Sequence, residues 1–265
     1  MATRAPAADG PHSVTETEVL PAHQHKGVGA FSSAPQQPWR HPRAFRPPGA
    51  PAGSWTRTPW WHCVLYDPYE RVNVWSHGVP SLLLVLLGLA ALSGHVPGST
   101  PMALFCTLAA TCQSFSALAH VYPDHHGLEK LDHIGILGLM FGTPYSELLA
   151  HIQFKDLDVD LSPLLCMVVL GLLAAFFPPA PRTISFGAAV VGMFCIYWDE
   201  LISTSMVVQL GLYLIGAICF LRNGGHNRGM GLADHHILHY VVTAACSVHA
   251  LHLWTLSSGA GQKAT

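Results

Sequence analysis

The chain has few charged residues. Only 11% of its 265 residues are Asp, Glu, Lys or Arg, whereas a soluble domain averages about 25%. Half of the residues are hydrophobic, and the mean hydropathy is +0.34. These values argue against an ordinary soluble protein, and the lack of a basic stripe argues against binding to nucleic acid. The composition therefore predicts a chain that is largely embedded in a membrane.

The sequence also lacks any paired-cysteine motif. Its seven Cys residues are scattered, with no CxxC, and most fall within apolar runs. Such cysteines behave as small buried hydrophobic residues, so a disulfide framework is not expected. Histidine, in contrast, is abundant, with 18 residues.

Lys and Arg are absent from a series of apolar runs that recur from Trp60 onwards. Each run is near the roughly 20 residues that a transmembrane helix needs. The shortest separation is the segment WDEL at 198–201, where two adjacent acidic residues favour a tight turn rather than a single long span. The sequence thus predicts an all-α bundle of seven transmembrane helices, near residues 74–94, 101–121, 133–152, 161–178, 183–198, 203–221 and 236–256.

The distribution of basic residues predicts the orientation of this bundle. With the N-terminus inside, all but two of the 13 Lys and Arg residues, Lys155 and Lys263, fall in inner segments, as the positive-inside rule requires. We therefore expect a disordered cytosolic tail at 1–58, a seven-helix domain at 60–257, and a short extracytosolic tail at 258–265. The protein is expected to be a multi-pass integral protein, of the plasma membrane or of an internal one.

Several polar residues meet at one depth in this topology. Ser116 and His120 lie four residues apart at the inner end of the second span, and Asp132 lies in the first turn of the third. His235 and His239 lie four residues apart at the inner start of the seventh span, so their side chains share one helix face. All five are predicted to lie in the inner leaflet.

Three inward-facing imidazoles at one depth suit Zn²⁺. A set of three histidines leaves the fourth position of a tetrahedral zinc for water, as in catalytic sites, and zinc lowers the pKa of that water towards about 7. We predict that His120, His235 and His239 are the metal ligands, that Asp132 accepts the proton of the water, and that Ser116 hydrogen-bonds the water or the anion formed on a substrate.

Other interpretations of these histidines remain open at this point. An HxxxH pair within a membrane also serves as a hydrogen-bonding device between helices, two histidines on different helices can clamp a haem, and a proton relay is a third option. His249 and His252 lie too far along the last span to join the site, and His236 faces away from it. Asn73 and Ser76 are interpreted as a cap of the first span.

The chain resembles the progestin and adipoQ receptor family, which includes the adiponectin receptors and the hemolysin III-like proteins. The segment ERVNVWSHG at 70–78 resembles the family's first-helix motif. SALAH at 116–120, followed by LDHIGI at 131–136, resembles its Ser-x-x-x-His and Leu-Asp-x-x-Gly-Ile blocks. HHILH at 235–239 resembles its last-helix His-x-x-x-His. Each block is weak alone, but their order and spacing make the resemblance specific.

The resemblance implies a seven-helix protein with a cytosolic N-terminus. It implies zinc held by His120, His235 and His239, with Asp132 contacting the zinc-bound water. Family members are described as receptors for adiponectin or steroids, and some are linked to ceramide hydrolysis. The wider superfamily contains alkaline ceramidases with a similar His and Asp set.

Our leading hypothesis is a zinc-dependent hydrolysis of a lipid amide, similar to that of a ceramidase, with membrane lipids as substrates. The alternative is a signalling receptor with a structural zinc, and a haem or proton-transfer protein is a more distant one. An extracellular hormone or steroid ligand and a homo-oligomer are left open as partners. The chain departs from the family at Asp234 and His236, where Ser and Gln are usual, so the reaction does not follow from the resemblance alone.

Overall fold

The structure is a computed structural model, and it describes residues 58–263 apart from 97–98, 175, 178 and 223–232. The predicted tail at 1–58 therefore lies outside the described residues, except for Thr58.

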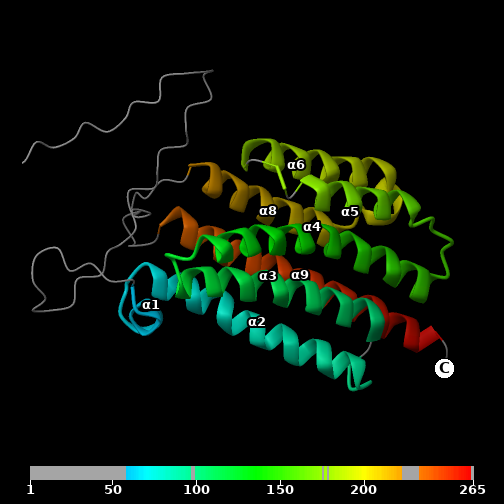
Figure 1. The fold of residues 1–265 in the computed structure, drawn as a ribbon. Helices are drawn as coiled ribbons and strands as arrows, with labels where there is room; N and C mark the ends of the chain where they lie inside the picture. The colour runs from blue at the N-terminus through cyan, green and yellow to red at the C-terminus, as the bar shows by residue number, and fades with distance from the viewer. Residues whose placement is uncertain (1–57, 97–98, 175, 178, 223–232, 264–265) are drawn as a thin grey trace, which may run out of the picture. The chain divides into compact units, whose positions relative to one another are not determined.

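The described residues form helices joined by short connections (Figure 1). All seven predicted spans overlap one helix each, and the segment WDEL forms a separate helical turn rather than a tight turn. The helices are α1 (Trp60–Leu65), α2 (Glu70–Leu92), α3 (Ser99–Val121), α4 (His126–Lys155), α5 (Ser162–Ala174), α6 (Pro179–Ile196), α7 (Trp198–Leu201), α8 (Thr204–Arg222) and α9 (Asp234–Lys263).

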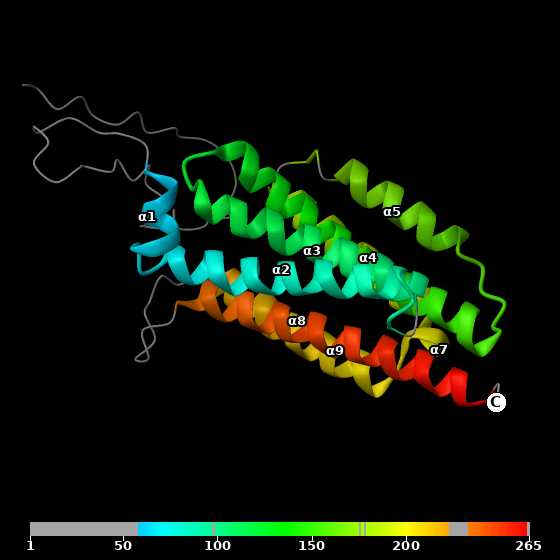
Figure 2. The same cartoon turned by 90° about the horizontal axis from the view of Figure 1, so that it is seen from below.

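Helix α9 lies against the helices at the beginning of the chain. The pairs α2–α3, α3–α4 and α8–α9 pack along their lengths, and α9 also contacts α2, α3 and α4. Figure 2 shows α9 beside α2, although the two helices are separated by most of the chain. This arrangement brings the last helix to the part of the bundle that carries the second and third predicted spans.

Two apolar clusters form the core. The first joins α2, α3, α4 and α9 through residues such as Met102, Phe105 and Leu253. The second joins α4 to α5, α6, α7 and α8 through residues such as Leu148 and Met193. Because α4 contributes side chains to both clusters, it connects the two halves of the bundle.

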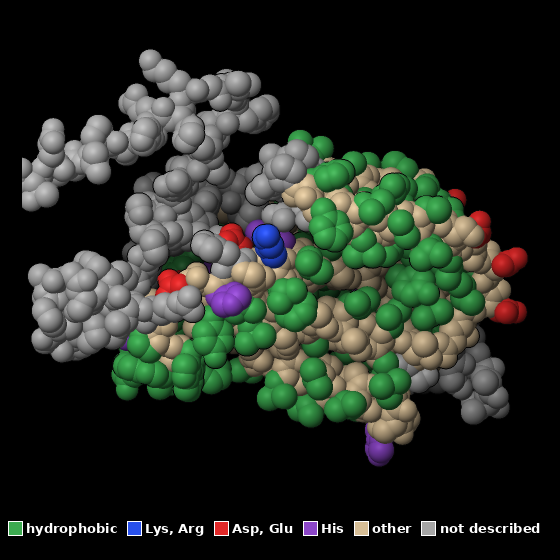
Figure 3. All heavy atoms as spheres, viewed as in Figure 1, with side chains coloured by type: hydrophobic (Ala, Val, Ile, Leu, Met, Phe, Trp, Pro, Cys, Tyr) green, Lys and Arg blue, Asp and Glu red, His purple; other side chains and the backbone are tan. Residues whose placement is uncertain are grey.

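Much of the surface is apolar. On α2, Leu82, Leu83, Leu86 and Leu89 are each more than half exposed. Figure 3 shows hydrophobic side chains spread over the helices, with Asp and Glu side chains towards the two ends. A soluble protein rarely exposes so extensive an apolar surface. The surface is the one expected of helices in contact with lipid.

Three of the described helical segments are long and apolar enough to cross a membrane, namely Glu70–Leu92, Thr100–Val121 and Asp234–Gly259. The segments Ser162–Ala174, Ile184–Ile196 and Thr204–Cys219 are apolar but shorter. By length and composition the structure thus supports three of the seven predicted spans, and the other four stay predictions.

Helix α1 is an element that the sequence pattern did not predict. Its aromatic residues Trp60 and Trp61, and Tyr66 directly after it, are exposed. The indole of Trp75 on α2 donates a hydrogen bond of 2.9 Å to the carbonyl of Val64, which fastens α1 to the start of α2. Exposed Trp and Tyr beside a spanning helix are typical of the membrane–water interface.

Helices α3 and α4 approach most closely at a glycine. A Cβ atom at Gly135 would lie 2.8 Å from the Cα atom of Cys112, closer than two carbon atoms can pack. We therefore expect Gly135→Ala to push the helices apart and to lower stability by about 1–3 kcal/mol, measured as the thermal unfolding of the detergent-purified protein.

Gly211→Ala is the matched control, because a Cβ atom at Gly211 in α8 meets no atom within 4 Å. Alanine favours a helix over glycine, so this variant should be as stable as the wild type or slightly more so. Equal stability of the two variants would contradict the close approach of α3 and α4.

Candidate metal centre

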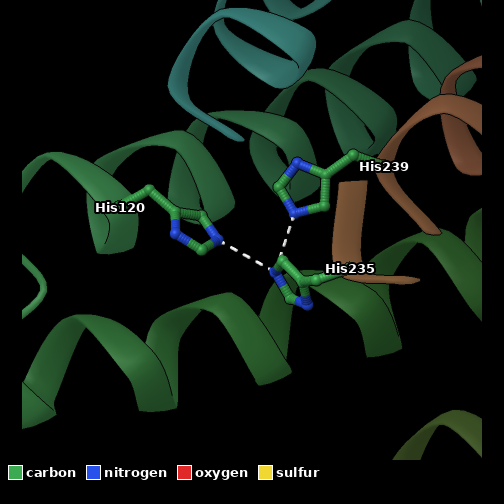
Figure 4. Close-up of side chains that lie close together, drawn as sticks. All are labelled: His120, His235 and His239. Carbon is green, nitrogen blue, oxygen red and sulfur yellow. Dashed lines mark hydrogen bonds between the residues drawn. The ribbon is translucent and has the colours of Figure 1, made fainter. Parts of the chain in front are cut away.

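Three histidines from two helices converge at one end of the bundle. His120 lies at the end of α3, and His235 and His239 lie in the first turns of α9. The Nε2 atom of His235 is 3.1 Å from that of His120 and 3.1 Å from that of His239 (Figure 4). One ligand atom from each residue lies within 4.8 Å of the others. The structure thus brings the three predicted ligands together.

The surroundings of His120 fix the position of its proton. Its Nδ1 atom is 2.8 Å from Oε2 of Glu70, and both side chains are buried. A carboxylate only accepts hydrogen bonds, so the Nδ1–H group of His120 donates to Glu70. In the neutral imidazole the lone pair then lies on Nε2, which faces the other two histidines.

The surroundings of His239 have the same effect. The hydroxyl of Ser76 donates to the carbonyl of Asn73 over 3.1 Å, which uses its only proton. The Oγ atom of Ser76 also lies 3.0 Å from Nδ1 of His239, so it accepts a hydrogen bond from Nδ1–H. The lone pair of His239 is therefore also on Nε2 and faces inwards.

This pattern of protons suits a cation at the centre of the group. The Nε2 lone pairs of His120 and His239 both point towards the Nε2 atom of His235. A single proton on that atom can form a full hydrogen bond to only one of them. Zinc binds imidazole nitrogens at roughly 2.0–2.1 Å, which in a tetrahedron places them about 3.3–3.4 Å apart. Two of the separations are 3.1 Å and the third is no more than 4.8 Å, so small shifts of the side chains would let the three residues hold a zinc ion.

The first turns of α2 pack against the histidine site. The Oδ1 atom of Asp67 accepts hydrogen bonds of 2.9 Å from the backbone N–H groups of Tyr69 and Glu70, which satisfies donors at the helix start. About two turns after Glu70, the ring of His77 stacks on that of His239, with centroids 3.7 Å apart and planes 5° from parallel. Side chains of α2 therefore help to orient the imidazole rings of His120 and His239.

Asp132 and Ser116, the predicted general base and hydrogen-bond donor, are not members of the histidine group, and their roles stay predictions. Among the described residues, the candidate ligand group contains histidines and no carboxylate. The close approach of Gly135 to Cys112 sets the register of the antiparallel helices α3 and α4. One turn nearer the connection between them, this register brings half-buried Asp132 level with buried Ser116, about 6 Å along α3 from His120 at 1.5 Å per residue.

His236 lies outside the group, as its helical phase predicts. Its Nε2 atom lies 3.1 Å from the carbonyl of Tyr69, to which it donates. Its Nδ1 atom accepts a hydrogen bond of 3.2 Å from the backbone N–H of Ala233. This departure from the usual family pattern thus links the start of α9 to the start of α2.

Three residues of α2 that surround the site were not predicted to belong to it. Glu70 and His77 belong to the segment ERVNVWSHG, which resembles the family's first-helix motif, but no role at the site was predicted for them. Ser76 was interpreted as a cap together with Asn73, but it contacts His239, while Asp67 binds the N–H groups at the start of the helix. A buried carboxylate at the inner end of the first span is the signal that could have identified Glu70, since it lies at the predicted depth of the histidines.

Comparison with known proteins agrees with this arrangement. The family model described as haemolysin-III related matches residues 67–250, which include α2 and all three histidines. No curated protein matches the chain.

We expect Glu70→Gln to weaken metal binding by about 10–100-fold, because a neutral amide behind a histidine ligand orients it less strongly than a carboxylate and makes its Nε2 atom less basic. The measurement is a titration of the detergent-purified protein with zinc against a competing chelator. Glu200→Gln, in α7, is the control and should bind as the wild type does. An unchanged affinity in Glu70→Gln would show that Glu70 does not orient His120 towards a metal.

Proposed function

We propose that this chain, which belongs to the haemolysin-III related family, is a zinc-dependent hydrolase of lipid amides of the ceramide class. It is an integral, multi-pass membrane protein. The observation that carries the proposal is the inward direction of the Nε2 lone pairs of His120 and His239, which Glu70 and Ser76 impose.

The proposal includes seven membrane crossings with the N-terminus in the cytosol. The convergence of the histidines supports it, because α3 ends and α9 begins at the same end of the bundle. An even number of crossings must then lie between Val121 and Asp234. Helices α4, α5, α6 and α8 supply four. The bias of Lys and Arg towards one side supports the orientation.

The donor set supports zinc as the metal. Three neutral imidazoles with one position left for water are the ligands of catalytic zinc sites. The same set argues against haem, because Nε2 atoms 3.1 Å apart leave no room for a macrocycle between them. A bound zinc supplies a Lewis acid that polarises a carbonyl and acidifies water to a pKa of about 7.

The residues of the chain have distinct roles in this proposal. His120, His235 and His239 hold the metal. Asp132 takes the proton from the attacking water and returns it to the leaving amine, as a general base and then a general acid. The hydroxyl of Ser116 donates a hydrogen bond to the oxygen of the substrate carbonyl. The level of Asp132 and Ser116, about one helical turn from His120, supports these roles.

A lipid substrate suits the position of the site. Its residues come from helix ends, while the flanks of the bundle are apolar and exposed. A lipid can thus keep its acyl chains along the helices and present an amide near the interface, where the head of a ceramide lies.

A signalling receptor with a structural zinc is the second candidate. The observation that favours it is that the histidines and their partners join α2, α3 and α9, as a structural metal would. A hormone or steroid ligand and a homo-oligomer belong to this candidate and stay predictions.

The variant Asp132→Asn distinguishes the two functions. In the hydrolase it should lower the rate of ceramide hydrolysis by roughly 10²–10⁴-fold, while zinc content and thermal stability stay unchanged. The measurement is turnover of ceramide and related lipid amides by the purified protein in lipid vesicles. Asp158→Asn, in the exposed connection after α4, is the control.

If the wild type turns over no lipid amide although it binds zinc, the hydrolase proposal is wrong and the receptor remains. If it turns over substrate and Asp132→Asn does so equally fast, the hydrolase stands but the role of Asp132 does not.

A further inference from the structure

A second group of titratable side chains lies farther along α9 than the histidine site, where α9 meets the C-terminal part of α4. It consists of Glu147, His151 and Lys155 on α4 and of His249 and His252 on α9. Ten residues separate His239 from His249, which is about 15 Å along a helix. The proposed hydrolysis uses none of these residues.

Glu147 is the centre of this group. Its carboxylate is wholly buried, and Oε1 lies 2.7 Å from Nε2 of His252 and 3.3 Å from Nε2 of His151. Burial of an unpaired carboxylate is costly, and a bond as short as 2.7 Å is typical of a charge-assisted pair. The Nε2–H group of His252 therefore donates a hydrogen bond to the Glu147 carboxylate across the contact between α4 and α9.

His151 lies between Glu147 and the end of α4. Its Nε2 atom is 3.0 Å from Nζ of Lys155 as well as 3.3 Å from Glu147. An ammonium group only donates and a carboxylate only accepts. One nitrogen cannot accept from Lys155 and donate to Glu147 at the same time. Without a proton, Nε2 of His151 accepts a hydrogen bond from Lys155. With a proton, it donates one to Glu147, so the two bonds compete.

The exposure of these three side chains increases along α4. Glu147 and His151 are buried, whereas Lys155, the last residue of the helix, is exposed. The contact with Lys155 therefore connects the buried Nε2 atom of His151 to an exposed side chain. The helix itself leads from the surface to the buried carboxylate in two turns.

The other neighbours of Glu147 do not compete for its proton. The hydroxyl of Ser146 donates to the carbonyl of Thr143 over 2.9 Å, so over 2.8 Å it accepts from Nε2–H of His249. The opposite side of this imidazole packs on Phe105 of α3 at 4.4 Å. His249 therefore directs its Nε2–H group to Ser146 and not to Glu147.

The remaining elements packed near Glu147 present apolar side chains. Leu148 of α4 packs with Leu164 of α5 and Leu201 of α7 in the second core cluster. Among the described residues, the titratable side chains in direct polar contact with the Glu147 carboxylate are His151 and His252.

We propose that Glu147 is a proton-binding site, separate from the metal centre, and that His151 connects it to the aqueous phase at the end of α4. Water donates a proton to Nε2 of His151 when Lys155 moves away, and the resulting imidazolium passes this proton to the Glu147 carboxylate. The sum is the transfer of one proton from the aqueous phase to Glu147, with His151 returned to its neutral form.

The first test asks whether Glu147 takes up a proton. Dicyclohexylcarbodiimide, an apolar reagent, attaches to protonated carboxyl groups within a membrane, and peptide mass spectrometry locates it. In the wild-type chain in lipid nanodiscs, we expect labelling of Glu147 to increase as the pH is lowered from about 9 to about 5. The experiment needs no variant to fold.

The second test asks whether His151 carries the proton. After a rapid drop in pH, the carboxylic C=O stretch in the infrared should appear with a rate that His151→Phe lowers by about tenfold or more, with its amplitude kept. His95→Phe, an exposed histidine beyond α2, should leave the rate unchanged. Glu147→Gln should remove the signal.

Two results would overturn the proposal. If Glu147 stays unlabelled from about pH 5 to pH 9, it is a permanently ionised clamp between α4 and α9. If it is labelled but His151→Phe leaves the rate unchanged, the proton reaches Glu147 by another way. Neither measurement depends on zinc or on lipid turnover. A failure of this proposal can therefore be distinguished from a failure of the proposed function.

Discussion

The hydrogen bond from Nδ1–H of His120 to Glu70 is the interaction on which the site depends. It crosses from α3 to α2 over 2.8 Å between two buried side chains. It keeps a carboxylate satisfied in the bundle and leaves the Nε2 lone pair of His120 towards α9. Ser76 does the same for His239 from one and a half turns further along α2. Without these partners three imidazoles could satisfy one another by sharing protons, and the site would be a packing device.

Helix α9 unites the two polar groups of the molecule. Its first turns carry His235 and His239, and later turns carry His249 and His252, which face Glu147 and Ser146 of α4. Polar residues buried in a membrane protein are costly and mark functional positions. Because α9 carries groups of both kinds, a shift of α9 against α4 would also move His235 and His239, two of the three candidate ligands.

The fold was predictable from the sequence to the extent that single helices are. Each apolar run predicted a helix, and the acidic pair at 198–201 correctly marked the break between α6 and α8. The convergence of His120 with His235 and His239 followed from counting crossings, because the parity of the crossings decides which helix ends meet. Helix α1 was not predicted, since six residues with exposed aromatic side chains show no clear period.

The partners of the histidines could not be predicted in the same way. Which side chains of α2 face α3 and α9 depends on the rotation of α2 about its axis, and packing between helices sets this rotation. The first-helix motif contains Glu70, Ser76 and His77, but their contacts with the histidines are known only from the structure. His249 and His252 were correctly separated from the site by distance, but their pairing across α4 depends on residues about a hundred positions away.

If the Nε2 atoms of His120, His235 and His239 hold a metal ion, the purified protein must contain it. The decisive measurement is elemental analysis of the detergent-purified wild-type protein beside the double variant His235→Ala, His239→Ala. We expect about one zinc per chain in the wild type and loss of zinc in a folded double variant. A well-folded wild-type protein without zinc, or a double variant that retains it, would show that these histidines do not form a zinc site.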